Sequence, residues 1–183
     1  MWVLVLIMIV VILGVLLIRY MDQHRWQRYQ FERDLYFRQY PLLLQCGEQF
    51  AMTLQLNKVM QKKLINELML KPQEQCFVKK ALIQRAEDVG GQKYTIKVSI
   101  HDKIFAYLDV AYANALGEQL HSTDFEIGRP IEVLAEIMVF YTDNVNTARQ
   151  ERGCRLRLDL PHDPDSVLHY LMEGTKAFFV DQS

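Results

Sequence analysis

The feature that most constrains this 183-residue chain is an uncharged apolar run over residues 1–18, MWVLVLIMIVVILGVLLI. At about 1.5 Å rise per residue a helix of this run covers roughly 27 Å, close to the roughly 30 Å hydrocarbon thickness of a bilayer. No basic residue precedes the run and no small-residue cleavage site follows it, so it does not have the pattern of a cleaved signal peptide. The sequence therefore predicts a transmembrane anchor over residues 1–18.

The flanks of this run predict its orientation. Aromatic residues favour membrane interfaces, and arginines are enriched on the cytoplasmic side. The residues expected at the interfaces are Trp2, Arg19, Tyr20, Arg25, Trp26 and Arg28. We therefore expect a single-pass protein with its N-terminus outside and its C-terminal domain in the cytoplasm, most simply at a bacterial inner membrane. The odd number of cysteines, Cys46, Cys76 and Cys154, fits a reducing compartment.

Two further segments follow the predicted anchor. Residues 19–40 contain no glycine or proline and predict an amphipathic juxtamembrane helix that ends before Pro41. Residues 41–183 are enough for one soluble domain with one core. Residues 19–80 carry eleven basic and six acidic side chains, whereas residues 81–183 carry ten and sixteen. This asymmetry favours the membrane and other proteins as partners, argues against nucleic acid, and leaves a homo-oligomer open.

The expected fold class is mainly α, with α+β as the alternative. Apolar residues at helical spacing predict helices over 42–70, 72–88 and 130–148, and a last helix to about Gly174. Alternating apolar residues predict strands near 94–100 and 154–160, which we expect to pair as a small two-stranded element. Residues 93–120 fit either one long helix, or a strand to Ile100 and then a helix capped by Asp102. We adopt the second interpretation.

The sequence contains no motif that names a reaction. It has no phosphate-binding glycine loop, no close pair of zinc ligands and no serine in a nucleophile turn. We therefore assign no catalytic residue, no cofactor and no metal site, and expect a protein that is not an enzyme. Two His/Asp pairs, His101/Asp102 and His162/Asp163, could support acid–base chemistry or a metal, but turn and helix-cap roles explain them as well.

The strand around Arg155 and Arg157 carries two positive side chains on one face, which could receive an acidic peptide or a phosphate group. A charged edge strand that resists aggregation explains the same pattern, and we favour this second interpretation. The hypothesis from the sequence is a membrane-anchored docking or scaffold protein, a subunit of a membrane-associated complex. The alternative is a membrane-tethered enzyme or small-ligand sensor that uses His101/Asp102 or His162/Asp163.

Overall fold

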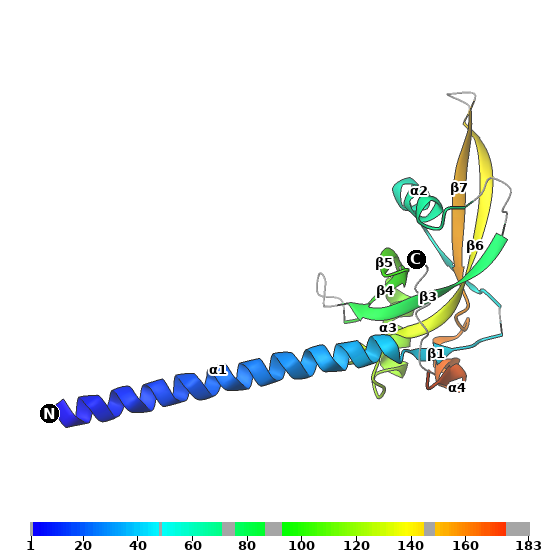
Figure 1. The fold of residues 1–183 in the computed structure, drawn as a ribbon. Coiled ribbons are helices and arrows are strands. Elements are labelled where there is room, and N and C mark those ends of the chain that lie inside the picture. Colours follow the sequence, from blue (N-terminus) through cyan, green and yellow to red (C-terminus); the bar gives the residue numbers. More distant parts are fainter. Residues whose placement is uncertain (1, 48, 71–75, 87–92, 145–148, 175–183) are drawn as a thin grey trace. The chain divides into compact units, whose positions relative to one another are not determined.

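The structure, a computed structural model, describes residues 2–47, 49–70, 76–86, 93–144 and 149–174. The chain divides into two compact units, Met1–Phe37 and Arg38–Ser183, and we call the second unit the sheet domain. The long N-terminal helix is α1 (Trp2–Gln39). The helical elements of the sheet domain are α2 (Lys58–Glu67), α3 (Val110–Gln119), the 3-10 turn η1 (Pro164–Ser166) and α4 (Val167–Tyr170). Its strands are β1 (Leu42–Leu44), β2 (Met52–Leu54), β3 (Cys76–Ala86), β4 (Thr95–Ile100), β5 (Lys103–Tyr107), β6 (Ile131–Asn144), β7 (Arg149–Leu158) and β8 (Leu171–Met172) (Figure 1).

The predicted membrane anchor is not supported by the structure. Among the described residues, no helix combines the length and the apolar character that crossing a bilayer requires. The predictions of a single-pass anchor over 1–18, of its orientation and of an inner-membrane location are therefore wrong.

The helix predicted over residues 19–40 is confirmed as a helix, because α1 continues without a break to Gln39. Tyr40 is a bend, as expected for a residue that precedes proline. Along α1, Tyr20 and His24 meet edge to face with ring centroids 4.6 Å apart, and Trp26 stacks on Tyr29 at 5.8 Å. These are contacts between neighbouring turns of one helix.

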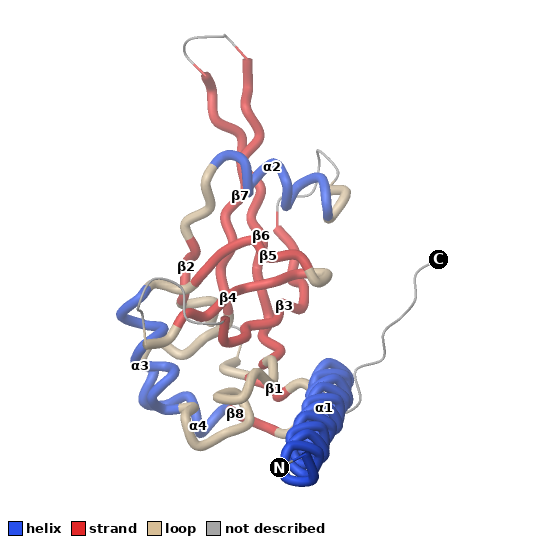
Figure 2. The backbone as a smooth tube through the Cα atoms, turned by 90° about the vertical axis from the view of Figure 1, so that its left-hand side faces the viewer, coloured by secondary structure: helices blue, strands red, loops and turns tan. Residues whose placement is uncertain are grey.

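The sheet domain is a mixed α and β fold, which overturns the expectation of a mainly helical domain. Its eight strands form one sheet, in which β2-β7-β6-β3-β4-β5 are neighbours in that order, while β1 pairs with β6 and β8. All pairings are antiparallel except that of β1 with β6. The β6–β7 hairpin is the longest and extends beyond the other strands (Figure 2). The strands predicted near 94–100 and 154–160 exist as β4 and β7, but they do not pair with one another.

The core lies on one face of this sheet, which we call the inner face. Every second residue of β6 from Ile131 to Val139 is buried there, together with alternate residues of β4 and β7. The helices α2, α3 and α4 contribute Leu64, Leu116 and Val167 to the same cluster. The helices thus cover the inner face, and burial of these side chains supplies the main stabilisation of the fold.

Helix α2 connects strands that lie far apart in the sheet. The Cys154 amide of β7 donates to the Gln61 side-chain oxygen at 3.4 Å, and Glu67 forms an ion pair with Lys103 of β5. The helix ends in a Schellman motif, with Leu70 N–H bonded to Ile65 O and Met69 N–H bonded to Asn66 O, both at 3.1 Å. Met69 has a positive φ of 48° and occupies the position of this motif where glycine is usual.

The three long helices predicted from apolar periodicity are wrong. Residues 42–70 contain β1, β2 and the shorter α2, residues 72–88 contain β3, and residues 130–148 contain β6. In β6 the misleading signal has a physical source. Leu134 and Met138 lie on the opposite face from Ile131 and Ile137 and are themselves half-buried, so apolar residues occupy both faces and imitate a helical spacing.

Residues 93–120 follow the strand-then-helix interpretation, but the helix starts later than predicted. His101 and Asp102 have φ of 48° and 61° and form the two-residue turn of the β4–β5 hairpin, where Ile100 pairs with Lys103. Asp102 is therefore a turn residue and does not cap a helix. Asp109 caps α3 instead, by accepting a hydrogen bond from Ala111 N–H at 3.0 Å.

Candidate functional site

The two predicted His/Asp pairs lie in exposed turns. His101 and Asp102 form the tip of the β4–β5 hairpin, and His162 and Asp163 precede η1. Asp163 accepts a hydrogen bond from Asp165 N–H at 3.2 Å, which is the helix-cap role that the sequence also allowed. Within the described part of the chain, no three His, Cys, Asp or Glu side chains come together as metal ligands. The geometry thus gives both pairs a local structural role.

The residues predicted at a membrane interface all belong to α1. They are exposed in the structure: Trp2, Arg19, Tyr20, Arg25, Trp26 and Arg28. Because the structure does not support the membrane span that these residues were predicted to flank, we propose no membrane role for them.

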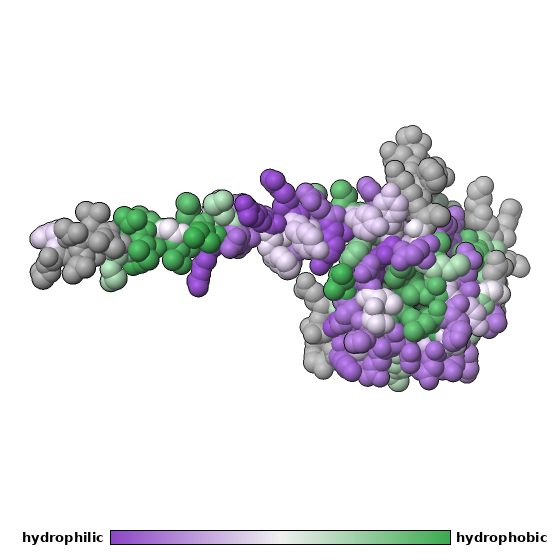
Figure 3. All heavy atoms as spheres, turned by 90° about the horizontal axis from the view of Figure 1, so that it is seen from below, coloured by the Kyte–Doolittle hydropathy of each residue, from purple (hydrophilic) through white to green (hydrophobic). Residues whose placement is uncertain are grey.

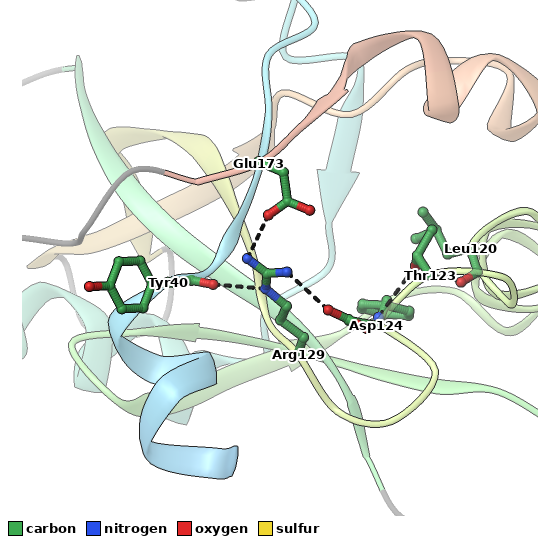
Figure 4. Close-up of polar contacts among 7 residues, drawn as sticks. Tyr40, Leu120, Thr123, Asp124, Arg129 and Glu173 are labelled. Atoms are coloured by element: carbon green, nitrogen blue, oxygen red, sulfur yellow. Dashed lines mark hydrogen bonds and ion pairs between the residues drawn. The ribbon is translucent and has the colours of Figure 1, made fainter. Parts of the chain in front are cut away.

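Two buried charged residues organise the sheet domain. Arg129 lies just before β6 and donates from Nε to Tyr40 O at 2.8 Å, from Nη1 to Asp124 at 3.0 Å and from Nη2 to Glu173 at 2.8 Å (Figure 4). Its guanidinium thereby connects the residue after α1, the loop before β6 and the residue after β8. The fixed fork of donors in arginine suits such a three-way contact.

Asp159 is the second buried charge, fully enclosed just after β7. Its carboxylate accepts hydrogen bonds from the backbone N–H groups of Gln49 at 2.9 Å and of Cys46 at 3.2 Å. It therefore holds the connection between β1 and β2. Both buried charges have structural partners, so neither has the open coordination of a reactive group.

The outer face of the sheet is the candidate functional site. The helices α2, α3 and α4 cover the inner face, whereas the strand register brings apolar and basic side chains together on the outer face. We define the outer sheet surface as Val78 and Lys80 of β3, Leu134 and Met138 of β6, and Arg155 and Arg157 of β7. Val78 is 45% exposed, a large fraction for an apolar side chain near the middle of a sheet.

The acidic and basic side chains on this surface differ in their exposure to solvent. Glu136 forms an ion pair with Arg157 at 2.8 Å, and Glu132 with Lys80 at 2.7 Å. Glu132 and Glu136 are only 15% and 16% exposed, whereas Lys80 is 73% exposed. The carboxylates thus lie low between the strands and the cations stand above them. With the exposed Arg155, the outer sheet surface presents a positive rim around apolar side chains.

The structure places both predicted partner-binding arginines on this surface. Arg155 lies opposite Met138, and Arg157 lies opposite Glu136, in the register of β6 and β7. Alternation along β7 was enough to put them on one face. Their neighbours Val78 and Lys80 were missed, because β3 had been predicted as a helix and its register with β6 cannot be derived from local sequence.

The cysteines differ in exposure. Burial raises the pKa of the Cys46 thiol to about 12, with a smaller contribution from Asp159, and raises the pKa of Cys154 to about 11. Cys76 is exposed at the start of β3 and lies opposite Met138, beside the outer sheet surface. Its Sγ is 3.5 Å from Glu136 Oε1. Cys76 is therefore a natural reporter of access to this surface.

A shallow hollow of about 390 Å³ lies on the other side of the sheet, between α2 and β7. It is lined by Lys62, Ile65, Asn66 and Arg152. Arg152 donates from Nη1 to Leu70 O at 2.8 Å and so supports the end of α2. This contact gives the arginine a structural role, and we assign no ligand to the hollow.

No protein-family model matches the chain, and comparisons with curated proteins and with solved structures find no significant match.

Proposed function

We propose that the sheet domain is a docking module of a larger protein assembly, and that the outer sheet surface is its docking site. The observation that carries the proposal is the exposed apolar side chain of Val78, flanked by Leu134 and Met138 and by the cations Lys80 and Arg155. Apolar side chains grouped within a polar rim are typical of protein interfaces.

The charge arrangement supports docking as well. Lys80 and Arg157 pair with Glu132 and Glu136 on their own sheet, so Arg155 gives the surface its net positive charge. Such a surface attracts an oppositely charged partner over a distance and then buries apolar area on contact. The enzyme or sensor alternative gains no support, because both His/Asp pairs lie in exposed turns.

Site-specific photo-crosslinking tests this proposal. A photoreactive phenylalanine analogue placed at Val78 in the full chain should give a discrete cross-linked product. The matched control carries the same analogue at Val59, which is 72% exposed on α2 and lies outside the outer sheet surface. The proposal expects a product from position 78 that is absent, or at least tenfold weaker, from position 59.

Equal products from the two positions, or none from position 78 in cells that make the protein, would overturn the docking site. The unfolding midpoint of each variant serves as the folding control, because exposed sites tolerate substitution with little change in stability.

A further inference from the structure

The outer sheet surface has a complementary surface on the same domain. Two exposed carboxylates lie at η1, Asp163 just before it and Asp165 within it, and two exposed apolar side chains, Leu168 and Tyr170, lie on α4. We define these four residues as the α4 surface. Figure 1 places α4 at the lower end of the sheet domain, where Leu168 is 45% and Tyr170 37% exposed. Seen from below, the domain surface is largely hydrophilic with a hydrophobic patch (Figure 3). The domain therefore presents a basic apolar surface and an acidic apolar surface.

The two surfaces differ in charge. The outer sheet surface carries Lys80, Arg155 and Arg157, two of which pair with the largely covered Glu132 and Glu136. The α4 surface carries the exposed carboxylates Asp163 and Asp165. Two copies of such a domain attract one another head to tail and repel one another when like ends meet.

We propose that the occupant of the outer sheet surface is the α4 surface of a second copy of this chain. This inference rests on the proposed docking function and names its partner. Arg155 and Lys80 of one copy face Asp163 and Asp165 of the next, while Leu168 and Tyr170 pack on Val78 and Met138. Because the two surfaces differ, the contact is heterologous and leaves one free surface of each kind at the ends of every oligomer.

The α4 surface is built to be rigid enough for such a contact. Asp165 accepts a hydrogen bond from Gln119 of α3 at 2.8 Å, and the Tyr112 hydroxyl donates to Pro161 O at 2.6 Å. The Gln45 amide donates to Tyr170 O at 3.3 Å. Three hydrogen bonds, two from α3 and one from the residue after β1, thus hold the turn and helix in place before a partner arrives, which lowers the ordering cost of association.

Sedimentation of the full chain at several concentrations tests the proposal. The mean mass should rise with concentration at low salt, and added salt should shift the half-association concentration upward. Arg155→Glu and Asp165→Lys should each raise that concentration at least tenfold, and an equimolar mixture of the two variants should regain association. Lys62→Glu, a charge reversal at an exposed cation outside both surfaces, should leave it within twofold.

Two outcomes would overturn this inference. One is a chain that stays monomeric at every concentration. The other is association that neither variant weakens, as contacts through α1 alone would produce. A monomeric chain that still cross-links from position 78 to a different polypeptide would refute self-docking and keep the docking function, so the two proposals fail separately.

Cross-linking through the natural thiol gives a second readout of the same geometry. Leu168 is exposed, so Leu168→Cys places a thiol on the α4 surface of a chain that also carries Cys76→Ser. Mixed with the unmodified chain under mild oxidation, this variant should form a disulfide-linked dimer between positions 76 and 168. A dimer formed by the double variant alone would show contact between two α4 surfaces and contradict the head-to-tail arrangement.

Discussion

Glu136 and Arg157 lie directly opposite one another on β6 and β7, and their side chains meet at 2.8 Å on the outer face of the sheet. This pair shows how the sheet can expose cations without exposing carboxylates. The Glu136 side chain is 16% exposed and that of Arg157 is 33% exposed, whereas Arg155, two residues earlier on β7, is exposed. The same arrangement, repeated by Glu132 and Lys80, contributes to the cations on the outer face of the sheet.

Asp159→Asn should destabilise the sheet domain by about 2–3 kcal/mol, because the carboxylate accepts two backbone N–H groups in a buried site and an amide can accept only on one side. Equilibrium urea unfolding measures the change. Asp109→Asn is the matched control, since asparagine caps a helix as well as aspartate does, and it should cost less than about 0.5 kcal/mol. Equal costs for the two variants would show that Asp159 is not held as described.

Met69→Gly should stabilise the domain by about 0.5–1 kcal/mol. Met69 occupies the left-handed position of the α2 Schellman motif at φ 48° and is 86% exposed, so glycine relieves strain and removes little packing. The free energy of unfolding checks this, with Met69→Ala as the control that removes the side chain but keeps the strain. A gain from alanine equal to that from glycine would contradict the backbone explanation.

Gly117→Ala should cost about 1–2 kcal/mol although alanine favours helices, because a Cβ at this position of α3 would lie 2.3–2.8 Å from ring atoms of Tyr94. The control is Gly14→Ala in α1, where a Cβ would meet nothing within 4 Å and no loss is expected. Thermal unfolding of both variants distinguishes crowding from helix propensity. An unchanged midpoint for Gly117→Ala would mean that α3 and Tyr94, the residue before β4, are not in close contact.

Alkaline pH should weaken the fold through Cys46. Its pKa is about 12 in the folded chain and near 9 in the unfolded one, so between these values the unfolded state loses a proton that the folded state keeps. Stability contributed by the neutral thiol is fully present below pH 9 and falls above it, by up to about 1.4 kcal/mol per pH unit. Urea unfolding at pH 8–11 should show a steeper decline for the natural chain than for Cys46→Ala. Parallel declines would contradict the burial of this thiol.

The sequence allowed some of this structure to be predicted and concealed the rest for identifiable reasons. Strands β4 and β7 were predicted because their apolar residues alternate with polar ones, as in a sheet with one wet face. Strand β6 was predicted as a helix because Leu134 and Met138 on its outer face are apolar too. The features that hid the strand from sequence analysis are thus the same residues that form the candidate docking site.

The hairpin between β4 and β5 was missed for a different reason. Its turn residues His101 and Asp102 adopt positive φ without the glycine that usually marks such a turn. Of the candidate site, the sequence allowed only the residues of one strand, β7, to be predicted. Alternation placed Arg155 and Arg157 on one face, but their partners Met138 and Glu136 depend on a register that no local pattern defines.

The central claim is that the outer sheet surface is covered by a protein partner, and the labelling rate of Cys76 tests it most directly. Cys76 is the exposed thiol beside this surface, while Cys46 and Cys154 are buried. The rate of maleimide labelling is compared between the purified chain at nanomolar concentration and the chain in cells that make it, with a Val59→Cys variant as the reference on α2. We predict that the ratio of the Cys76 labelling rate to the position-59 labelling rate is at least tenfold lower in cells than in the purified chain. The same ratio in cells and in the purified chain would contradict the account.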